Sequence, residues 1–346
     1  MRAAFLIAPR MFQCREIPLP VRREGEVLVR VQAAGVCGSD LHFYKTGRIG
    51  EVVLTEPFVM GHECSGVVED PGEFGNEIPR GTRVAVEPSM VCGSCLLCRQ
   101  GRPNLCLGLR FLGFPPYSGA YAEFVSLPRH NLYRIPDSIR DEEAPLIETL
   151  AVALHTVKLA GKVSGRTAAI LGAGPVGLLT LLELRRRGVR VAFVTEPVDS
   201  RRKTAQSLGA EAALDPGESE ALSERRGALD GLGPDLVVET AGQPESFQQA
   251  LDVVRPGGTV VYCGIYPLRY FSIDFTPARR KELVIRFVRR STPGNYAEAI
   301  RLLTQGQIEI SRLTVRTYEL DRVSEAFRDA EERVPGLIKA ILLPST

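Results

Sequence analysis

The 346-residue sequence has little net charge and no long hydrophobic run. Its 43 lysines and arginines nearly balance its 41 aspartates and glutamates, so the formal net charge is only +2 at pH 7. Such a balance does not point to nucleic acid or to a charged membrane surface. No segment approaches the roughly 20 apolar residues that a membrane span requires. We therefore expect neither nucleic acid nor a membrane as a partner.

The N-terminus has too little apolar sequence for a secretory signal, because the stretch Met1–Ile7 is too short. A cytoplasmic location is the default expectation. Eight cysteines could form disulfides in a secreted protein, but four of them are spaced as in a zinc site, and the reducing cytosol favours metal thiolates. Cys14, Cys64 and Cys263 stand alone in the sequence, and we expect them to be small, buried apolar residues.

The first part of the chain is rich in short strand patterns. Apolar and polar residues alternate in Glu26–Val31, and Gly66–Val68 and Arg83–Val86 have the same character, with proline and glycine between them. These short strands predict a β-barrel-like domain rather than a parallel sheet.

The pattern changes near residue 150, where strand and helix patterns begin to alternate. Continuous apolar runs are typical of strands buried on both faces, and alternation with helices predicts a doubly wound parallel sheet. The expected helices are 149–160 and 175–187, and the expected strands are 167–171, 189–194, 235–239 and 259–262. A further helix (296–303) and strand (337–343) follow, and their pattern does not say which domain they join. The fold class is therefore α/β with two domains.

A glycine motif lies between the first of these strands and the helix that follows it. Gly172, Gly174 and Gly177 have the G-x-G-x-x-G spacing, and Pro175 and Val176 begin the helix. Glycine permits a tight turn and a close approach of the backbone to a pyrophosphate at the helix N-terminus. The motif predicts dinucleotide binding; the alternative is a glycine-rich turn without a nucleotide.

A carboxylate follows the next strand, as Glu196 lies about 20 residues beyond the last glycine, where an acid would bind ribose hydroxyls. Because a carboxylate would repel a 2′-phosphate, we favour NAD over NADP. Arg201 and Arg202 leave NADP open, since a nearby arginine can hold that phosphate.

Four cysteines form a closely spaced run. Thiolates at this spacing can wrap one zinc ion from a single loop, with every coordination position filled by protein. Such a closed site has a structural role. Its predicted ligands are Cys92, Cys95, Cys98 and Cys106.

A second set of metal-ligand residues lies upstream. Cys37 and the adjacent His62 and Glu63 supply the three ligands of a catalytic zinc, which keeps one position open. Glu148 could replace or supplement Glu63. Alternatively, Glu63 could orient a ligand, and Asp40 could fix a nearby loop.

Ser39 and His42 closely follow the first of these ligands. A hydroxyl two residues after a zinc ligand can hydrogen-bond a substrate oxygen, and an imidazole can pass the proton to solvent near neutral pH. The alternative for His42 is a partly exposed surface imidazole.

At these residues the chain resembles the zinc-dependent medium-chain dehydrogenase/reductase superfamily, over nearly its full length. The segments 35–50, 111–119 and 146–155 are similar to the polyol branch, which includes sorbitol, xylitol and L-iditol dehydrogenases. Thr149 is a departure, since proline usually follows the glutamate of this segment in the polyol branch.

The resemblance implies a GroES-like catalytic domain at 1–150 that is completed by 291–346, and a Rossmann domain at 151–290. It implies two zinc ions per chain. The catalytic zinc would bind Cys37, His62 and Glu63, with Glu148 as a nearby ligand or exchange partner, and the four-cysteine run would hold the structural zinc. It also implies a homodimer or homotetramer.

The predicted activity is NAD-linked oxidation of a secondary hydroxyl of a polyol or sugar alcohol to a ketone, and the reverse. Threonine, butanediol, glucose and aminocyclitol dehydrogenases use the same chemistry and remain alternatives. A non-catalytic nucleotide-binding regulator on the same scaffold is an alternative of another class. The substrate, the oligomer number and the direction of flux do not follow from the sequence.

Overall fold

The computed structural model describes residues 1–218, 220, 224 and 229–345. The chain forms two compact units, and the first contains Met1–Ala151, Ser291–Gly306 and Thr314–Thr346. The second unit contains Val152–Arg290 and Gln307–Leu313. Among the described residues, no helix has both the length and the apolar character needed to cross a membrane.

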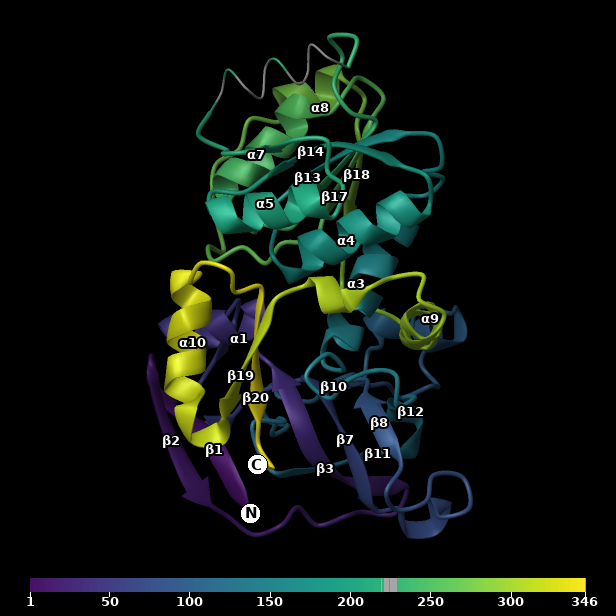
Figure 1. Ribbon diagram of the computed structural model, residues 1–346, viewed down its shortest axis with the longest axis vertical. Coiled ribbons are helices and arrows are strands. Elements are labelled where there is room, and N and C mark those ends of the chain that lie inside the picture. Colours follow the sequence, from purple (N-terminus) through teal and green to yellow (C-terminus); the bar gives the residue numbers. More distant parts are fainter. Residues whose placement is uncertain (219, 221–223, 225–228, 346) are drawn as a thin grey trace. The chain divides into compact units, whose positions relative to one another are not determined.

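The first unit is built around a seven-stranded sheet in the order β12-β8-β7-β3-β20-β19, with β11 paired to β3 (Figure 1). All neighbours are antiparallel except β19 and β20. The strands are β3 (Glu26–Gly35), β7 (Glu63–Asp70), β8 (Arg83–Val86), β11 (Phe124–Pro128), β12 (Leu132–Arg134), β19 (Val315–Glu319) and β20 (Lys339–Leu343).

Smaller sheets complete this unit. They are formed by β1 (Arg2–Ala8), β2 (Met11–Glu16) and β6 (Phe58–Val59), by β9 (Ser89–Met90) and β10 (Arg110–Phe111), and by β4 (Arg48–Ile49) and β5 (Val52–Val53). The helices are α1 (Gly38–Thr46), α2 (Leu96–Arg99), α9 (Pro293–Thr304) and α10 (Val323–Glu332), with short 3₁₀ turns at η1 (Gly72–Phe74), η2 (Pro103–Leu105), η3 (Arg129–Asn131) and η5 (Leu320–Arg322). The helix α3 (Leu146–Leu159) begins in this unit and continues into the second.

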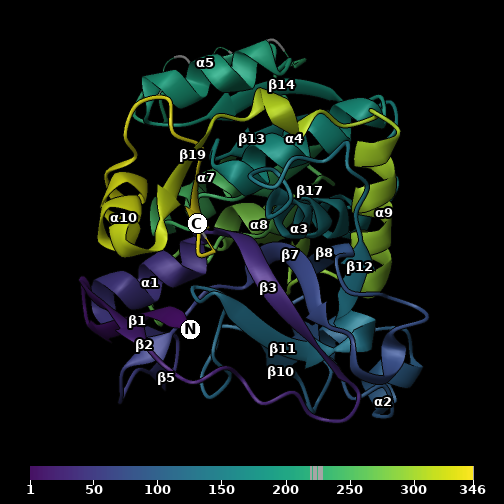
Figure 2. The same ribbon diagram turned by 60° about the horizontal axis from the view of Figure 1, so that its bottom comes forward.

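The apolar core of the first unit joins strands to the helix α10. Val29 and Val31 of β3 share this core with Tyr121 and with Phe327 of α10. The helix α1 contacts α10 (Figure 2). Burial of this alternating apolar face explains why β3 is a strand.

The register of three strands brings together the residues that matter most for the site. Gly35 at the end of β3 is opposite Glu63 on β7 and opposite Ile341 on β20. A Cβ atom on Gly35 would lie 2.5 Å from Oε2 of Glu63 and 2.9 Å from Cε of Lys339. Glycine therefore leaves the space that these two side chains fill.

The second unit contains a six-stranded parallel sheet in the order β15-β14-β13-β16-β17-β18. This is a doubly wound order: in chain order, β13 to β15 extend from the centre of the sheet to one edge, and β16 to β18 extend from the centre to the other edge. The strands are β13 (Thr167–Leu171), β14 (Arg190–Thr195), β15 (Ala213–Leu214), β16 (Leu236–Glu239), β17 (Thr259–Tyr262) and β18 (Val284–Phe287). The helices are α4 (Pro175–Arg186), α5 (Asp199–Ser207), α7 (Pro244–Val253) and α8 (Thr276–Arg280), and a 3₁₀ turn, η4 (Ile310–Arg312), also belongs to this unit.

Helices flank this sheet (Figure 1). Phe247 and Leu251 of α7 pack in one apolar cluster with Ala169 of β13, Val237 of β16 and Val260 of β17. The predicted strands at 167–171 and 259–262 have these bounds in the structure, because a strand buried on both faces is a continuous apolar run. The predicted α/β class is confirmed, with a mainly antiparallel sheet in the first unit and a parallel sheet in the second.

One expectation about isolated cysteines was wrong. Cys64 is buried, but Cys14 is exposed and Cys263 is only partly buried. Cys14 lies on β2, an edge strand whose residues are mostly exposed, and the sequence pattern did not reveal that edge.

Candidate functional site

The four predicted cysteine ligands come together in one loop of the first unit. Their sulfur atoms all lie within 4.8 Å of one another. The Sγ atoms of Cys92 and Cys106 are 3.4 Å apart, and those of Cys95 and Cys106 are 4.0 Å apart. Cys95 precedes the short helix α2, and Cys98 lies within it. A compact set of four thiols suits a tetrahedral zinc site with no open position.

Backbone amides stabilise one thiolate of this cluster, whereas burial raises the pKa of Cys98 to about 12. The amides of Ser94 and Cys95 lower the pKa of Cys92 to about 6. The thiolate is the metal-binding form of cysteine, so these amides favour the state that a zinc ion requires.

The three ligands predicted for the catalytic metal also meet. Candidate ligand atoms of Cys37, His62 and Glu63 lie within 4.8 Å of one another. Cys37 is the N-cap of α1, whereas His62 and Glu63 lie where β7 begins. His62 is 6 % exposed and Glu63 only 1 %. Cys37 is partly buried. A set of one sulfur, one nitrogen and one carboxylate oxygen suits zinc with a position left open.

Asp40 organises two of these groups. Its Oδ2 accepts hydrogen bonds from the Cys37 amide at 3.2 Å and from the Tyr121 hydroxyl at 2.6 Å. Its Oδ1 lies 3.5 Å from Nδ1 of His62. A carboxylate at Nδ1 orients the imidazole and leaves Nε2 for a metal.

The charge around His62 favours a cation. Burial alone would lower the pKa of His62, but the negative charges of Asp40 and Cys37 outweigh it and raise that pKa well above its usual value. The same negative charges would favour a divalent metal ion at this place.

Two further residues hold the Glu63 carboxylate. The Thr149 hydroxyl donates a hydrogen bond to Oε1 at 3.1 Å, and the Lys339 ammonium forms an ion pair with Oε2. The contacts of Tyr121, Thr149 and Lys339 were not predicted from the sequence. The available signal was a lysine in the otherwise apolar final strand pattern.

Glu148 lies in the first turn of α3 and is 8 % exposed. Burial and the neighbouring Glu63 carboxylate raise the pKa of Glu148 to about 7. Its carboxylate does not belong to the group of ligand atoms within 4.8 Å. The geometry therefore gives Glu63 the closer place and Glu148 a nearby one.

Ser39 and His42 both lie on α1, the helix that begins after Cys37. They are three residues apart, a spacing that puts side chains on one helix face. Both are partly buried.

The nucleotide loop of the second unit follows β13. Gly172 has a φ of +105°, and a Cβ on Gly177 would collide with the Gly172 carbonyl oxygen. Gly174 is the N-cap of α4, and a Cβ there would meet open space. Among the described residues no side chain caps α4, whose first residues are Pro175 and Val176. The first amides of α4 are therefore available to an anion such as a pyrophosphate.

Glu196 follows β14 and is buried against this loop. Its Oε2 accepts a hydrogen bond from the Ala173 amide at 3.0 Å, and its Oε1 accepts one from the Val198 amide at 3.1 Å. Arg201 is a buried residue of α5. Arg202 donates to the Glu196 carbonyl at 2.7 Å and to Asp215 at 3.0 Å. Arg202 is thus already committed to protein acceptors.

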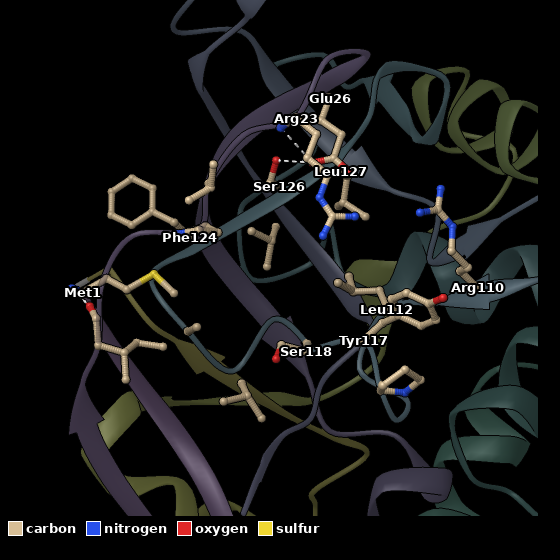
Figure 3. A pocket seen from close by; sticks show the side chains of 18 of the residues that line it. Met1, Arg23, Glu26, Arg110, Leu112, Tyr117, Ser118, Phe124, Ser126 and Leu127 are labelled. Atoms are coloured by element: carbon tan, nitrogen blue, oxygen red, sulfur yellow. Dashed lines mark hydrogen bonds between the residues drawn. The ribbon is translucent and has the colours of Figure 1, made fainter.

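A separate cavity of about 470 Å³ lies in the first unit. Figure 3 shows its apolar lining, including Phe124 and Leu112, and the side chains of Arg23 and Arg110. None of the predicted site residues lines it. This cavity is therefore not the predicted active site, because its lining contains none of the predicted residues.

Two regions of the chain match models of known protein families. Residues 23–137 match the model for an alcohol dehydrogenase GroES-like domain. Residues 175–305 match the model for a zinc-binding dehydrogenase.

Individual relatives match nearly the whole chain. A sorbitol dehydrogenase of Bacillus subtilis is 34% identical over 345 residues, covering 100% of this chain and 98% of the relative. A D-xylulose reductase A of Aspergillus oryzae is 33% identical and covers 92% of this chain and 90% of the relative. The crystal structure of a putative zinc-binding dehydrogenase from Sinorhizobium meliloti, bound to NADP, has a TM-score of 0.88 and 31% identity, and 99% of each chain is covered.

Proposed function

Because this chain belongs to the zinc-dependent medium-chain dehydrogenase family, we propose that it oxidises a secondary hydroxyl of a polyol or sugar alcohol to a ketone, reversibly. The main support for this proposal is that possible metal-ligand atoms of the partly buried Cys37 and the buried His62 and Glu63 lie close together in a chain that also has the nucleotide loop. The names of the sorbitol and xylulose relatives support the substrate class. The two compact units would be the catalytic and nucleotide-binding domains.

The donor sets define the proposed metal sites. Cys37, His62 and Glu63 would hold a catalytic zinc, and Glu148 would be an additional or exchanging ligand. When bound, zinc acts as a Lewis acid that lowers the pKa of a hydroxyl. The four-cysteine loop would hold a second, structural zinc.

Residues of α1 would carry the proton. Ser39 would accept it from the substrate hydroxyl, and His42 would pass it to solvent. Asp40 would keep His62 in one orientation during the reaction. Activity that stays unchanged in Ser39→Ala would exclude this proton route.

The nucleotide loop and α4 would bind the pyrophosphate, and Glu196 would bind the ribose hydroxyls. When bound, NAD accepts the hydride. The buried Glu196 favours NAD, whereas Arg201 and the NADP-bound relative keep NADP as the alternative. The ratio of kcat/KM with NAD to kcat/KM with NADP should exceed one, and a ratio below one would overturn the assignment.

The central prediction concerns Cys37. Changing Cys37 to serine replaces a thiolate ligand by a poorly coordinating hydroxyl, so turnover with a polyol should be abolished. NAD binding, measured by quenching or enhancement of NADH fluorescence, should remain within about threefold of wild type, because Cys37 lies in the other compact unit. Full activity in this variant would refute the proposed metal chemistry.

Substrate panels and metal analysis separate the alternatives. A higher kcat/KM for threonine, butanediol, glucose or an aminocyclitol than for polyols would assign that activity to the chain instead. Two bound zinc ions per chain support the enzyme, and a single one supports the non-catalytic regulator.

We further propose a cytoplasmic homodimer or homotetramer. β18 lies at the edge of the six-stranded sheet, where Val284 is 43 % exposed and Phe287 is 64 % exposed. An exposed apolar edge strand invites pairing with another chain. Val284→Lys should therefore lower the mass measured by light scattering. The control Lys203→Met, at an exposed position on α5, should keep the wild-type mass, and an unchanged mass in Val284→Lys would exclude this edge.

A further inference from the structure

Two side chains contact the carboxylate of Glu63, one at each oxygen. Lys339 of β20 forms an ion pair with one oxygen, and Thr149 of α3 donates a hydrogen bond to the other at 3.1 Å. Lys339 is 3 % exposed and Thr149 is 1 % exposed. Each oxygen of this carboxylate thus has its own buried partner, a hydrogen-bond donor at Oε1 and an ion-pair partner at Oε2.

Lys339 is the only buried lysine among the residues that the structure describes. Removing an ammonium from water is unfavourable unless a close opposite charge compensates it. Its burial is therefore tied to the Glu63 carboxylate beside it.

The sheet reserves space for this pair. Gly35 of β3 is in register with Glu63 of β7, and a Cβ at Gly35 would press on both Glu63 and Lys339. Three neighbouring strands therefore contribute to one arrangement, which holds the two charged groups on a rigid element rather than on a loop.

The two donors leave the carboxylate able to bind a metal. An ionised carboxylate has about four lone-pair sites, so a donor on each oxygen leaves further sites free. The Asp40 and Glu63 carboxylates lie in the same region, and the Lys339 ammonium forms an ion pair with the second of them. Without the Lys339 ammonium, the Glu63 carboxylate would lose its ion-pair partner and the positive charge that compensates its own charge.

We propose that Lys339 and Thr149 are positioning residues that hold Glu63 as the third protein ligand of the catalytic metal site. This inference rests on the proposed function, because it presupposes a metal at Cys37, His62 and Glu63. Groups that orient a ligand usually change metal affinity about 10- to 100-fold when they are removed. The four-cysteine site should not respond, since neither residue contacts its cysteines.

The test compares Lys339→Met, Lys339→Arg and Thr149→Val in the full-length chain. Zinc affinity is measured by competition with a chromogenic chelator, and cobalt absorption spectra report the ligand geometry. Lys339→Met should weaken the open site about 10- to 100-fold and shift its cobalt bands, whereas Lys339→Arg should recover part of the affinity. Thr149→Val should give a smaller change in the same direction.

Two control variants remove similar groups elsewhere. Lys281→Met removes an ammonium that donates to three backbone carbonyls, at Leu251, Asp252 and Val254. Thr156→Val removes another buried hydroxyl from α3, one that donates to the Val152 carbonyl at 2.8 Å. Both controls should keep wild-type zinc affinity and cobalt bands, even where they lower the unfolding temperature.

The outcomes separate this inference from the proposed function. Wild-type affinity and wild-type cobalt bands in both Lys339→Met and Thr149→Val would overturn the positioning role, provided that Cys37→Ser loses the open-site metal. If wild type and Cys37→Ser bind zinc equally, the proposed metal site itself fails, and the positioning role fails with it. An equal loss of affinity in Lys339→Met and Lys281→Met would show a general structural effect and would also overturn the inference.

Discussion

Burial of a carboxyl group makes its ionised form unfavourable in the folded chain. Glu87 follows β8, is 2 % exposed and accepts a hydrogen bond from Tyr133 at 3.4 Å. Burial raises the pKa of Glu87 to about 8, although the Tyr133 hydroxyl acts in the opposite direction. Charging this residue is therefore unfavourable in the folded chain.

This shift predicts a pH dependence of stability. The folded chain binds the proton of Glu87 more tightly than the unfolded chain does, so this residue lowers stability as the pH rises from its ordinary pKa of 4.5 to about 8. Glu87→Gln removes the titration. Between pH 5 and pH 8, the unfolding temperature of the variant should decrease less than that of wild type, as measured by differential scanning fluorimetry.

The control for this prediction is Glu24→Gln, which changes an exposed carboxylate. Its pH profile should follow that of wild type. Parallel profiles for Glu87→Gln and wild type would show that Glu87 does not titrate in this range.

Among the elements, the turn between β13 and α4 leaves little space for side chains at two of its glycines. Gly177 must lack a Cβ because the Gly172 carbonyl occupies that place, whereas Gly174 faces open space. The first position serves the packing of helix against strand, and the second keeps the backbone accessible. The same motif therefore contains two glycines with different physical reasons.

Alanine substitutions should separate these reasons. Gly177→Ala should lower both the unfolding temperature and NAD affinity, because its Cβ displaces the loop. Gly174→Ala should keep the unfolding temperature within about 2 °C of wild type, since a fraction of a kcal/mol shifts Tm little in a chain of this size. It should nevertheless weaken NAD binding at least tenfold, measured by NADH fluorescence titration. Unchanged NAD affinity in Gly174→Ala would mean that the pyrophosphate does not approach this residue.

At the largest scale, the proposed structural metal and the sheets would stabilise different parts of the chain. The four-cysteine loop contains only the four-residue helix α2 and the three-residue turn η2. Such short elements do not form stably alone, so a metal would contribute most of the order of this loop. The parallel sheet of the second unit has its own apolar core and does not depend on that loop.

Metal removal should therefore act locally. Cys98→Ser would remove one of the four proposed sulfur ligands, and limited trypsin digestion should then cut first after Arg99, which Gln100 follows. NAD affinity should stay within about threefold of wild type, because the nucleotide loop belongs to the other compact unit. An unchanged digestion pattern, with zinc content equal to that of wild type, would exclude a structural metal at this loop.

Local patterns in the sequence predicted much of the second unit. The strand at 167–171 and the glycine turn after it have short-range signals, because burial on both faces and tight turns restrict neighbouring residues. Edge strands such as β2 were not predicted, since their exposed residues follow no clear period. The amphipathic helix α10 was likewise not identified from the sequence, although Phe327 joins the main core.

The four-cysteine run and the glycine turn could be predicted without a structure, because each depends on residues close together in the chain. The distant residues that surround Glu63 depend on tertiary contacts. Thr149 and Lys339 are separated from it by 86 and 276 positions, and no periodicity predicts such contacts. The pairing of β3 with β7 and β20 brings Glu63 and Lys339 together, and Gly35 leaves the space in which a buried lysine compensates a buried carboxylate.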